Sequence, residues 1–299
     1  MNAAIHLLRR ATRSSVRIEA SIPERHPSAQ ILGTSRVGSG SIVASEGLIL
    51  TVNYVVLGAN ALSVTLQDGQ ELPADLAAMD LTSGLALLRV EATSLPALSF
   101  ATSRDLRLGD EVFVVSCIGE SNFRVADGFV TYLGPFDANW EYTLDRAIMS
   151  SALNPGLGGG ALVDRLGRAV GVVSLSLNTV GKFTLGIPGE CYLDHRDELV
   201  RHGRRRTLTP RAWLGVFCHT MQDHVVIAGL LPGAPAERAG LKQGDVILTI
   251  DGRGVADRRA LYDQLWTHRA GDAVNLQIFR DNEVQTVRIP TVDVEEFFA

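Results

Sequence analysis

Side chains that could work together as a nucleophile and its base are scarce in the first two thirds of the chain. No histidine lies between His26 and His195, and Lys182 is the only lysine in that span. A serine nucleophile needs such a base, usually an imidazole, to accept its proton. The serines beside the motifs described below are therefore predicted to be polar groups of turns and strands: Ser83, Ser150 and Ser151.

The cysteines indicate neither a disulfide framework nor a metal centre. There are 3 of them, Cys117, Cys191 and Cys218, an odd number at wide spacing. Disulfide-rich domains and zinc sites carry even or closely spaced sets. We expect buried, reduced thiols, and we predict no metal ion and no cofactor.

Composition and charge restrict the class of protein and of partner. The 299 residues are 46% hydrophobic and 20% charged, which is ordinary for a folded chain of about two domains. The net charge of −5 argues against a nucleic-acid partner, since such proteins are normally basic. No run of about 18 uncharged apolar residues occurs, so membrane insertion is not predicted.

The N-terminal segment, residues 1–14, is predicted to contain a short amphipathic helix over residues 3–11. Its apolar stretch is interrupted by Arg9 and Arg10. A secretory signal places its charges first and follows them with about 7–15 apolar residues. The segment does not have this order, and the sequence thus predicts a cytoplasmic chain.

Short strands are predicted over most of residues 15–200. Runs of β-branched and apolar residues, separated by turn signals such as QDGQ, extend from Ser15 to Val90 and again from Asp110 to Ile187. Two successive sets of such strands, with no long helix between them, favour paired barrels or a sandwich. The domain is therefore predicted to be mainly β.

A second, smaller domain is predicted at residues 212–299, after an arginine-rich linker at residues 201–211. Its pattern is a set of strands with one helix at about 258–268, for which Asp257 is the predicted N-cap. The chain ends in DVEEFFA. This apolar end is predicted either to pack on its own domain or to act as a ligand of this chain or of a neighbouring copy.

The segment LLPGAPAERAGLKQGDVILTIDGRGV of the smaller domain resembles the turn-and-helix signature of PDZ domains. A PDZ domain binds an extended peptide as an added strand, and a loop of backbone N–H groups holds the C-terminal carboxylate of the peptide. The alternative for the two leucines of the implied site is a place in the core. The resemblance implies these site residues: Trp213, Leu214, Gly215 and Val216 for the carboxylate, and Leu261 and Leu265 for the last side chain.

The first 200 residues resemble the trypsin-like protease domain of the HtrA, or DegP-like, family, in which that domain precedes a PDZ domain. The matching motifs are GSGSIVASEGLILTVNYVV, SGLALLRV and NPGLGGGAL. The family carries a catalytic histidine, aspartate and serine in these motifs, and Tyr54, Gly84 and Gly158 stand at the three positions here. The resemblance implies a mainly β fold, a trypsin-like double β-barrel followed by a PDZ domain.

The three replacements remove the imidazole, the carboxylate and the hydroxyl of the triad. We therefore predict a catalytically inactive HtrA-like pseudoprotease, not an enzyme, that acts as a peptide- or protein-binding scaffold or regulator through its PDZ domain. Its predicted partners are proteins or peptides with apolar C-termini, while an active HtrA homologue and a homo-oligomer stay open. Two alternatives are a non-catalytic subunit that modulates an active HtrA-type protease and a hydrolase with a relocated active site.

Overall fold

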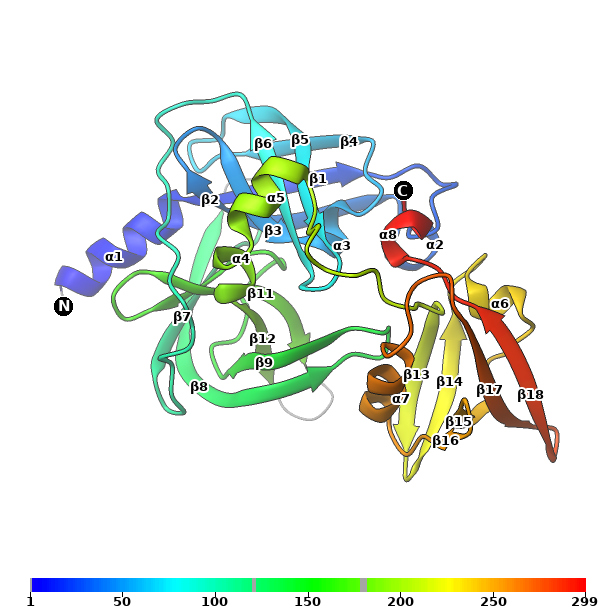
Figure 1. Ribbon diagram of the computed structural model, residues 1–299. Coiled ribbons are helices and arrows are strands. Elements are labelled where there is room, and N and C mark those ends of the chain that lie inside the picture. The colour runs from blue at the N-terminus through cyan, green and yellow to red at the C-terminus, as the bar shows by residue number, and fades with distance from the viewer. Residues whose placement is uncertain (1, 120–121, 178–181) are drawn as a thin grey trace. The chain divides into compact units, whose positions relative to one another are not determined.

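The computed structural model describes residues 2–119, 122–177 and 182–299 (Figure 1). Met1, the first residue of the predicted N-terminal segment, lies outside these ranges. The chain forms two units, each of which is described by itself below. The first unit comprises Met1–Pro135 and Leu144–Arg206, and the second comprises Phe136–Thr143 and Thr207–Ala299.

The first barrel is a closed sheet in the order β1-β2-β3-β6-β5-β4. Leu48, Ile49 and Leu50 of β3 are almost fully buried, so this apolar strand supplies much of the barrel core. Gly47, with φ of 88°, makes the turn that leads into β3, a conformation that glycine adopts without strain. The strands are β1 (Ser15–Ser21), β2 (Ser35–Ala44), β3 (Leu48–Val52), β4 (Ala61–Thr65), β5 (Glu71–Asp80) and β6 (Leu85–Val90).

The second barrel is also closed, in the order β10-β11-β12-β9-β8-β7. Its core includes the buried side chains of Val112, Val114 and Ile148. Strand β8 runs past the barrel to Asp137, and the residues that connect it to β9 belong to the second unit. The strands are β7 (Glu111–Cys117), β8 (Phe123–Asp137), β9 (Thr143–Ser150), β10 (Ala161–Asp164), β11 (Ala169–Leu177) and β12 (Phe183–Pro188).

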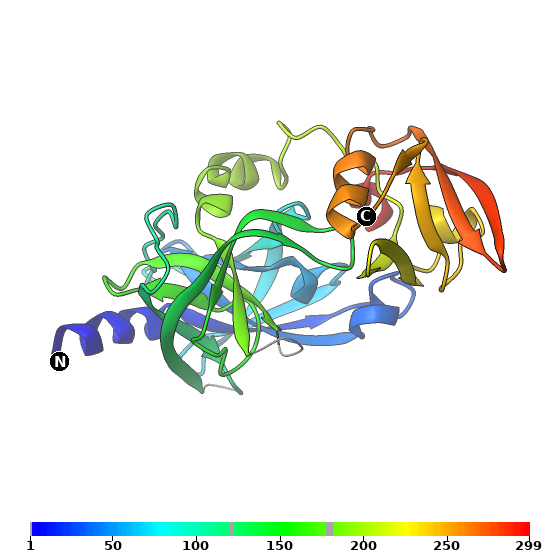
Figure 2. The same cartoon turned by 90° about the horizontal axis from the view of Figure 1, so that it is seen from below.

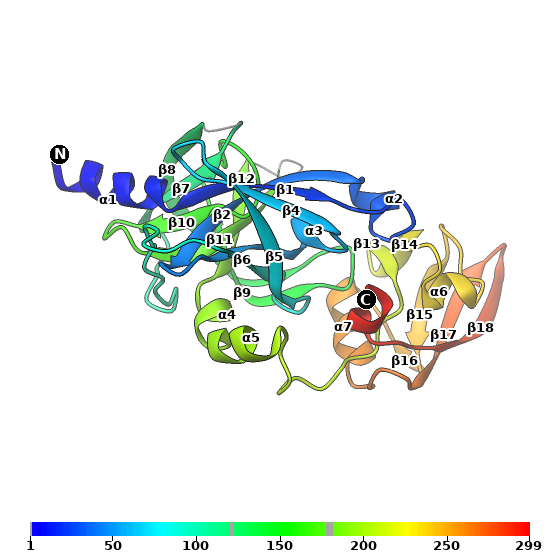
Figure 3. The same cartoon turned by 90° about the horizontal axis from the view of Figure 1, so that it is seen from above.

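Short helices complete the first unit. The N-terminal helix α1 leads directly into β1 (Figure 3). Helix α5 ends at Gly203, whose φ of 73° places it in the left-handed C-cap conformation. Among the described residues, no helix has the length and apolar character needed to span a bilayer. The helices are α1 (Asn2–Arg13), α2 (Ala29–Leu32), α3 (Asn53–Val56), α4 (Glu190–Leu193) and α5 (Arg196–His202).

The second unit is a sheet in the order β13-β14-β15-β17-β18, with β16 paired to β15. Along β17, Val274, Leu276 and Ile278 are fully buried and alternate with more exposed residues, as a strand with one face on a core requires. The elements are β13 (Val216–Met221), β14 (His224–Leu230), α6 (Pro235–Arg238), β15 (Val246–Ile250), β16 (Arg253–Gly254), α7 (Arg258–Leu265), β17 (Ala273–Arg280), β18 (Glu283–Pro290) and α8 (Val294–Phe297).

Helix α7 packs its apolar face into the core of this unit. Asp257 is its N-cap, and the Asp257 carboxylate accepts a hydrogen bond of 2.7 Å from the N–H of Ala260, which confirms the predicted cap. Two closed barrels followed by a small mixed domain also confirm the predicted mainly β fold.

Candidate functional site

The structure brings together the positions at which the resembled family carries its histidine and serine. The hydroxyl of Tyr54, from α3, donates a hydrogen bond of 2.9 Å to the carbonyl of Ser174 on β11. A Cβ atom added to Gly158 would lie 1.9 Å from the Tyr54 oxygen and 2.9 Å from the Ser174 carbonyl oxygen. The tyrosine hydroxyl therefore fills the space that a side chain at position 158 would need.

Burial raises the pKa of Tyr54 to about 12, so its hydroxyl keeps its proton and acts as a donor at neutral pH. The third position is Gly84. Its carbonyl accepts a hydrogen bond of 2.8 Å from the N–H of Asn53, the residue before Tyr54, so Gly84 lies next to this site. The three positions named from the resemblance thus lie near one another, and their correspondence to a catalytic triad stays a prediction. Hydrolysis by this chain would require groups other than the side chains of Tyr54, Gly84 and Gly158.

Hydrogen bonds hold the glycine-rich loop that contains Gly158. The carbonyl of Gly158 accepts a hydrogen bond of 2.7 Å from the N–H of Ser39 in the first barrel. The N–H of Leu157 donates to the carbonyl of Cys117 over 3.0 Å, and the N–H of Gly156 donates to the Asn154 side chain over 3.1 Å. These two N–H groups therefore already donate to acceptors within the protein and are not available to a bound substrate.

The candidate serines act as polar groups of turns and strands. The hydroxyl of Ser83 donates to the Asp80 carboxylate over 2.6 Å, and the hydroxyl of Ser151 accepts from the N–H of Phe129 over 3.0 Å. Ser150 is fully buried on β9. Cys117 and Cys218 are buried free thiols and Cys191 is a partly buried one. In the described ranges, no group of three or more metal-ligating side chains comes together.

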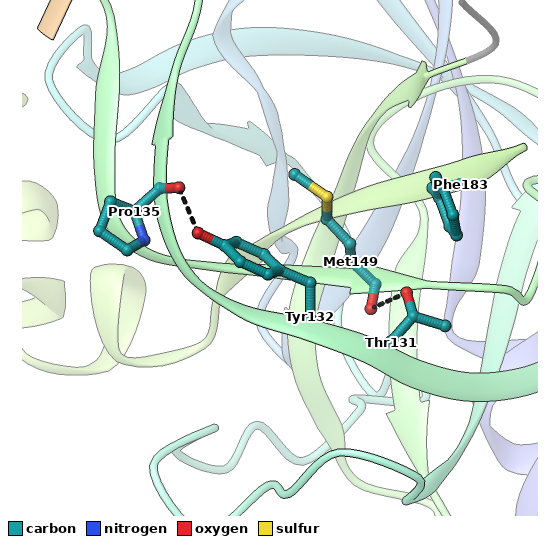
Figure 4. A pocket seen from close by; sticks show the side chains of 5 residues that line it. All are labelled: Thr131, Tyr132, Pro135, Met149 and Phe183. Carbon is teal, nitrogen blue, oxygen red and sulfur yellow. Dashed lines mark hydrogen bonds between the residues drawn. The ribbon is translucent and has the colours of Figure 1, made fainter. Parts of the chain in front are cut away.

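A pocket of about 240 Å³ lies on the second barrel (Figure 4). None of the residues that line it is charged, and none is a predicted site residue. The hydroxyl groups of Tyr132 and Thr131 donate to the backbone carbonyls of Pro135 and Met149, so they are not available to orient a ligand. The pocket is lined by Thr131, Tyr132, Pro135, Met149 and Phe183.

The predicted carboxylate loop of the second unit binds a carboxylate, that of Glu141. The N–H of Leu214 donates to one carboxylate oxygen over 2.9 Å. The N–H groups of Gly215 and Val216 donate to the other over 2.7 and 3.1 Å. Gly215 has φ of 79°, and a Cβ atom there would lie 2.3 Å from the Cβ of Ala234, so the loop requires glycine at this position.

Glu141 was missed by sequence reasoning. It lies in the connection between β8 and β9, 73 residues before the loop it contacts. Burial raises the pKa of its carboxyl group to about 7, although the three N–H donors act in the opposite direction. No motif marks this residue, because its role depends on a contact between distant segments.

The remaining predicted residues of the loop and the pocket lie in apolar surroundings. Leu261 and Leu265 share one face of α7 and are fully buried in the core of the second unit. The centroid of the Trp213 ring lies 4.9 Å from that of Phe297 and 5.9 Å from that of Phe298. The apolar C-terminal end thus packs on its own domain, one of the two arrangements expected for it.

Comparisons with known proteins agree with this architecture. The family described as trypsin-like peptidase domain matches residues 38–172, and the PDZ domain family matches residues 212–291. The chain is similar to a probable periplasmic serine endoprotease DegP-like of Marinomonas sp. (strain MWYL1), with 31% identity over 85% of this chain and 56% of the relative. The corresponding protein of Halomonas elongata is also 31% identical, over 86% of this chain and 56% of the relative. The chain thus spans little more than half the length of these curated relatives.

Solved structures of similar extent are also related. One is the HtrA-type protease AlgW with a tripeptide, with a TM-score of 0.60 and 27% identity over 97% of this chain and 96% of that one. Another is the serine endoprotease from Yersinia pestis, with a TM-score of 0.58 and 25% identity over 97% of this chain and 98% of that one. The resemblance to HtrA-type proteins with a trypsin-like domain and a PDZ domain is therefore confirmed.

The comparisons contradict two predictions. The prediction that the chain is not an enzyme rested on the three side chains at positions 54, 84 and 158, whereas the relatives are named serine endoproteases. The prediction of a cytoplasmic location rested on the order of charges near the N-terminus, whereas the curated relatives are named periplasmic. The N-terminal residues form helix α1, and the pattern of charges in such a helix does not determine the compartment.

Proposed function

From the premise that this is an HtrA-type chain, with a trypsin-like domain followed by a PDZ domain, we propose that it binds the C-terminal ends of polypeptides through the second unit. One observation carries the proposal: the N–H groups of Leu214, Gly215 and Val216 converge on a carboxylate. A peptide C-terminus offers the same chemical group, and hydrogen bonds to a charged acceptor are about twice as strong as neutral ones.

The elements beside this loop support the binding of an extended ligand. Strand β13 follows the loop directly and forms an edge of its sheet, and α7 provides the opposite wall. An edge strand presents backbone N–H and C=O groups that an added strand can pair with. Leu261 and Leu265 are proposed to form the apolar floor that contacts the last side chain of the peptide. We therefore expect a preference for apolar C-termini.

The relatives suggest where the ligands come from. The AlgW structures are described with a tripeptide and with a decapeptide, and the curated relatives are named periplasmic serine endoproteases. We propose a periplasmic location for this chain, and partners that are exposed polypeptide ends in that compartment. Association with copies of itself or with another HtrA-type protein belongs to the same proposal.

A binding experiment tests carboxylate capture. The probe is a pool of labelled decapeptides whose last four positions are randomised among Ala, Val, Leu and Phe, prepared once as free acids and once as C-terminal amides. Loss of a charge-assisted hydrogen-bond set of about 1.5–3 kcal/mol predicts that the free acids bind about tenfold more tightly or better. Equal binding of the two pools, for the native protein and for every variant below, would reject the proposal.

A further inference from the structure

Segment 138–141, defined as Ala138 to Glu141, forms hydrogen bonds with both strand β13 and helix α7 of the second unit. The carbonyl of Asn139 accepts a hydrogen bond of 2.7 Å from the N–H of Cys218 on β13. Cys218 is two residues beyond Val216, the last donor to the Glu141 carboxylate. The segment therefore combines a carboxylate at the loop with a backbone contact to the edge strand, which is how an added peptide strand binds.

Helix α7 contacts the same segment from the other side (Figure 2). The Tyr262 hydroxyl donates to the carbonyl of Ala138 over 3.0 Å and accepts from the N–H of Glu141 over 3.0 Å. Arg258, at the start of α7, donates to the Asp137 carboxylate over 2.8 Å and to the Asp137 carbonyl over 3.2 Å. Strand β13 and helix α7 thus both hold residues 137–141 through polar groups.

The backbone conformation of the turn directs the Glu141 carboxylate toward the loop N–H groups. Glu141 has φ of 52°, in the left-handed region that side chains other than Gly and Asn seldom adopt. The N–H of Ala138 donates to the carbonyl of Tyr142 over 2.8 Å and closes the turn, and the rings of Trp140 and Tyr142 stack with centroids 6.3 Å apart. A strained residue persists where its surroundings hold it in place, as the three loop N–H groups do here.

We propose that segment 138–141 is a built-in ligand of the PDZ groove, with the side-chain carboxylate of Glu141 in the place of a peptide C-terminus. The proposal rests on the function proposed above. An external peptide binds only when it displaces this segment, since both ligands need the same N–H groups of Leu214, Gly215 and Val216. A tethered ligand is present at a high effective concentration, so it lowers the apparent affinity for any competitor.

The first test compares peptide affinity among full-length variants. Glu141→Ala removes the built-in carboxylate, Glu141→Gln keeps its shape but not its charge, and Glu283→Gln removes one charge from an exposed position on β18. With the free-acid peptide pool, we expect Glu141→Ala to bind about tenfold more tightly than the native chain or better. Glu141→Gln should show a smaller gain, and Glu283→Gln should match the native chain.

The outcomes separate this inference from the proposed function. If the native chain and Glu141→Ala bind the free acids equally well, and both prefer them to the amides, the built-in ligand is refuted and carboxylate capture stands. If neither distinguishes free acids from amides, the proposed function fails and the inference fails with it. Should Glu141→Ala not fold, the same comparison is made with Glu141→Gln.

Amide hydrogen exchange gives a second measurement that needs no peptide. In the native chain, the N–H groups of Leu214, Gly215 and Val216 should exchange slowly, because each donates to Glu141. In Glu141→Ala these three amides should lose protection, while those of β17 keep theirs. Rapid exchange of the three amides in the native protein would overturn the inference directly.

Discussion

At the scale of single residues, Tyr54 and Gly158 are complementary in size. The tyrosine hydroxyl reaches the Ser174 carbonyl through the space that a Cβ atom at position 158 would occupy. Either residue constrains the other, because the Tyr54 hydroxyl occupies the space that a side chain at position 158 needs. We therefore expect substitutions at the two positions to be energetically coupled.

Substitution of Gly158 tests this complementarity. Gly158→Ala should lower the free energy of unfolding by about 1–3 kcal/mol, the usual cost of overpacking, since the new methyl group forces the Tyr54 hydroxyl off Ser174. The penalty should be smaller in a Tyr54→Phe background, which lacks the oxygen that clashes. Urea unfolding of both single variants and the double variant gives the coupling energy. An identical penalty in the two backgrounds would show that Tyr54 does not fill this space.

The Glu141 carboxyl group predicts a pH dependence of stability. Burial raises its pKa from 4.5 to about 7, so the folded state holds a proton that the unfolded state releases between these values. Its contribution is therefore fully present below about pH 4.5 and is lost as the pH rises through about 7. The other titratable groups that face it are Arg258, which pairs with Asp137, and Tyr262 and Cys218. Burial raises the pKa of Tyr262 and that of Cys218.

The measurement is the stability of the native chain relative to Glu141→Gln as a function of pH. Stability of the native chain should rise relative to the variant as the pH falls from 8 to 5. Amide exchange at Gly215 should slow in parallel, beyond its intrinsic pH dependence. A relative stability that falls over this range would mean that the three N–H donors, and not burial, dominate the pKa of Glu141.

At the scale of elements, helix α7 determines the shape of the peptide groove. Its Tyr262 contacts segment 138–141 and its Arg258 contacts the preceding residue, Asp137. Leu261 and Leu265 contribute to the core below. A helix of this length has little stability of its own and depends on its cap and its packing. The Asp257 cap therefore affects the groove as well as the fold.

Removal of the cap tests this dependence. Asp257→Ala should cost the second unit about 1 kcal/mol, because the N–H of Ala260 loses its acceptor. Amides of α7 should exchange faster, and protection of the loop amides should decrease with them, since α7 holds the segment that carries Glu141. Glu283→Ala, on an exposed strand position, serves as the control and should change neither. If only the amides of α7 exchange faster, the loop amides do not depend on the cap of this helix.

The sequence predicted these elements better than it predicted their contacts. Alternating apolar residues and turn signals are local, so the barrels and the Asp257 cap could be inferred from neighbouring residues. Tyr54, Gly84 and Gly158 were located through motifs of the same kind. The role of Glu141 depends on the exit of β8 from its barrel and on a contact across 73 residues, which no local pattern encodes.

At the scale of the whole molecule, the chain consists of two units with separate cores. Among the described residues, the buried core cluster of the second unit draws on residues 212–289, and a core cluster of the second barrel draws on residues 112–173. Units with their own cores usually unfold as separate cooperative transitions. Residues 136–143 connect two barrel strands and nevertheless belong to the second unit.

Calorimetry should therefore show two transitions that respond to different substitutions. Glu141→Ala should lower the midpoint of the second unit by about 4 °C or more, as expected for about 1 kcal/mol in a domain of this size, and should leave the barrel transition in place. Gly158→Ala should lower the midpoint of the barrel transition and leave that of the second unit in place. If either variant shifts both transitions equally, the two units unfold as one.

A glutamate on a turn has one further consequence for the PDZ groove. The groove accepts a carboxylate carried by a side chain, with the main chain continuing on both sides of it. If segment 138–141 is the built-in ligand proposed above, a partner needs no free end, because an acidic residue at the tip of a hairpin offers the same acceptor. Cyclic peptides that copy the turn from Asp137 to Tyr142 would be inhibitors of this groove, and they would resist the exopeptidases that degrade linear ligands.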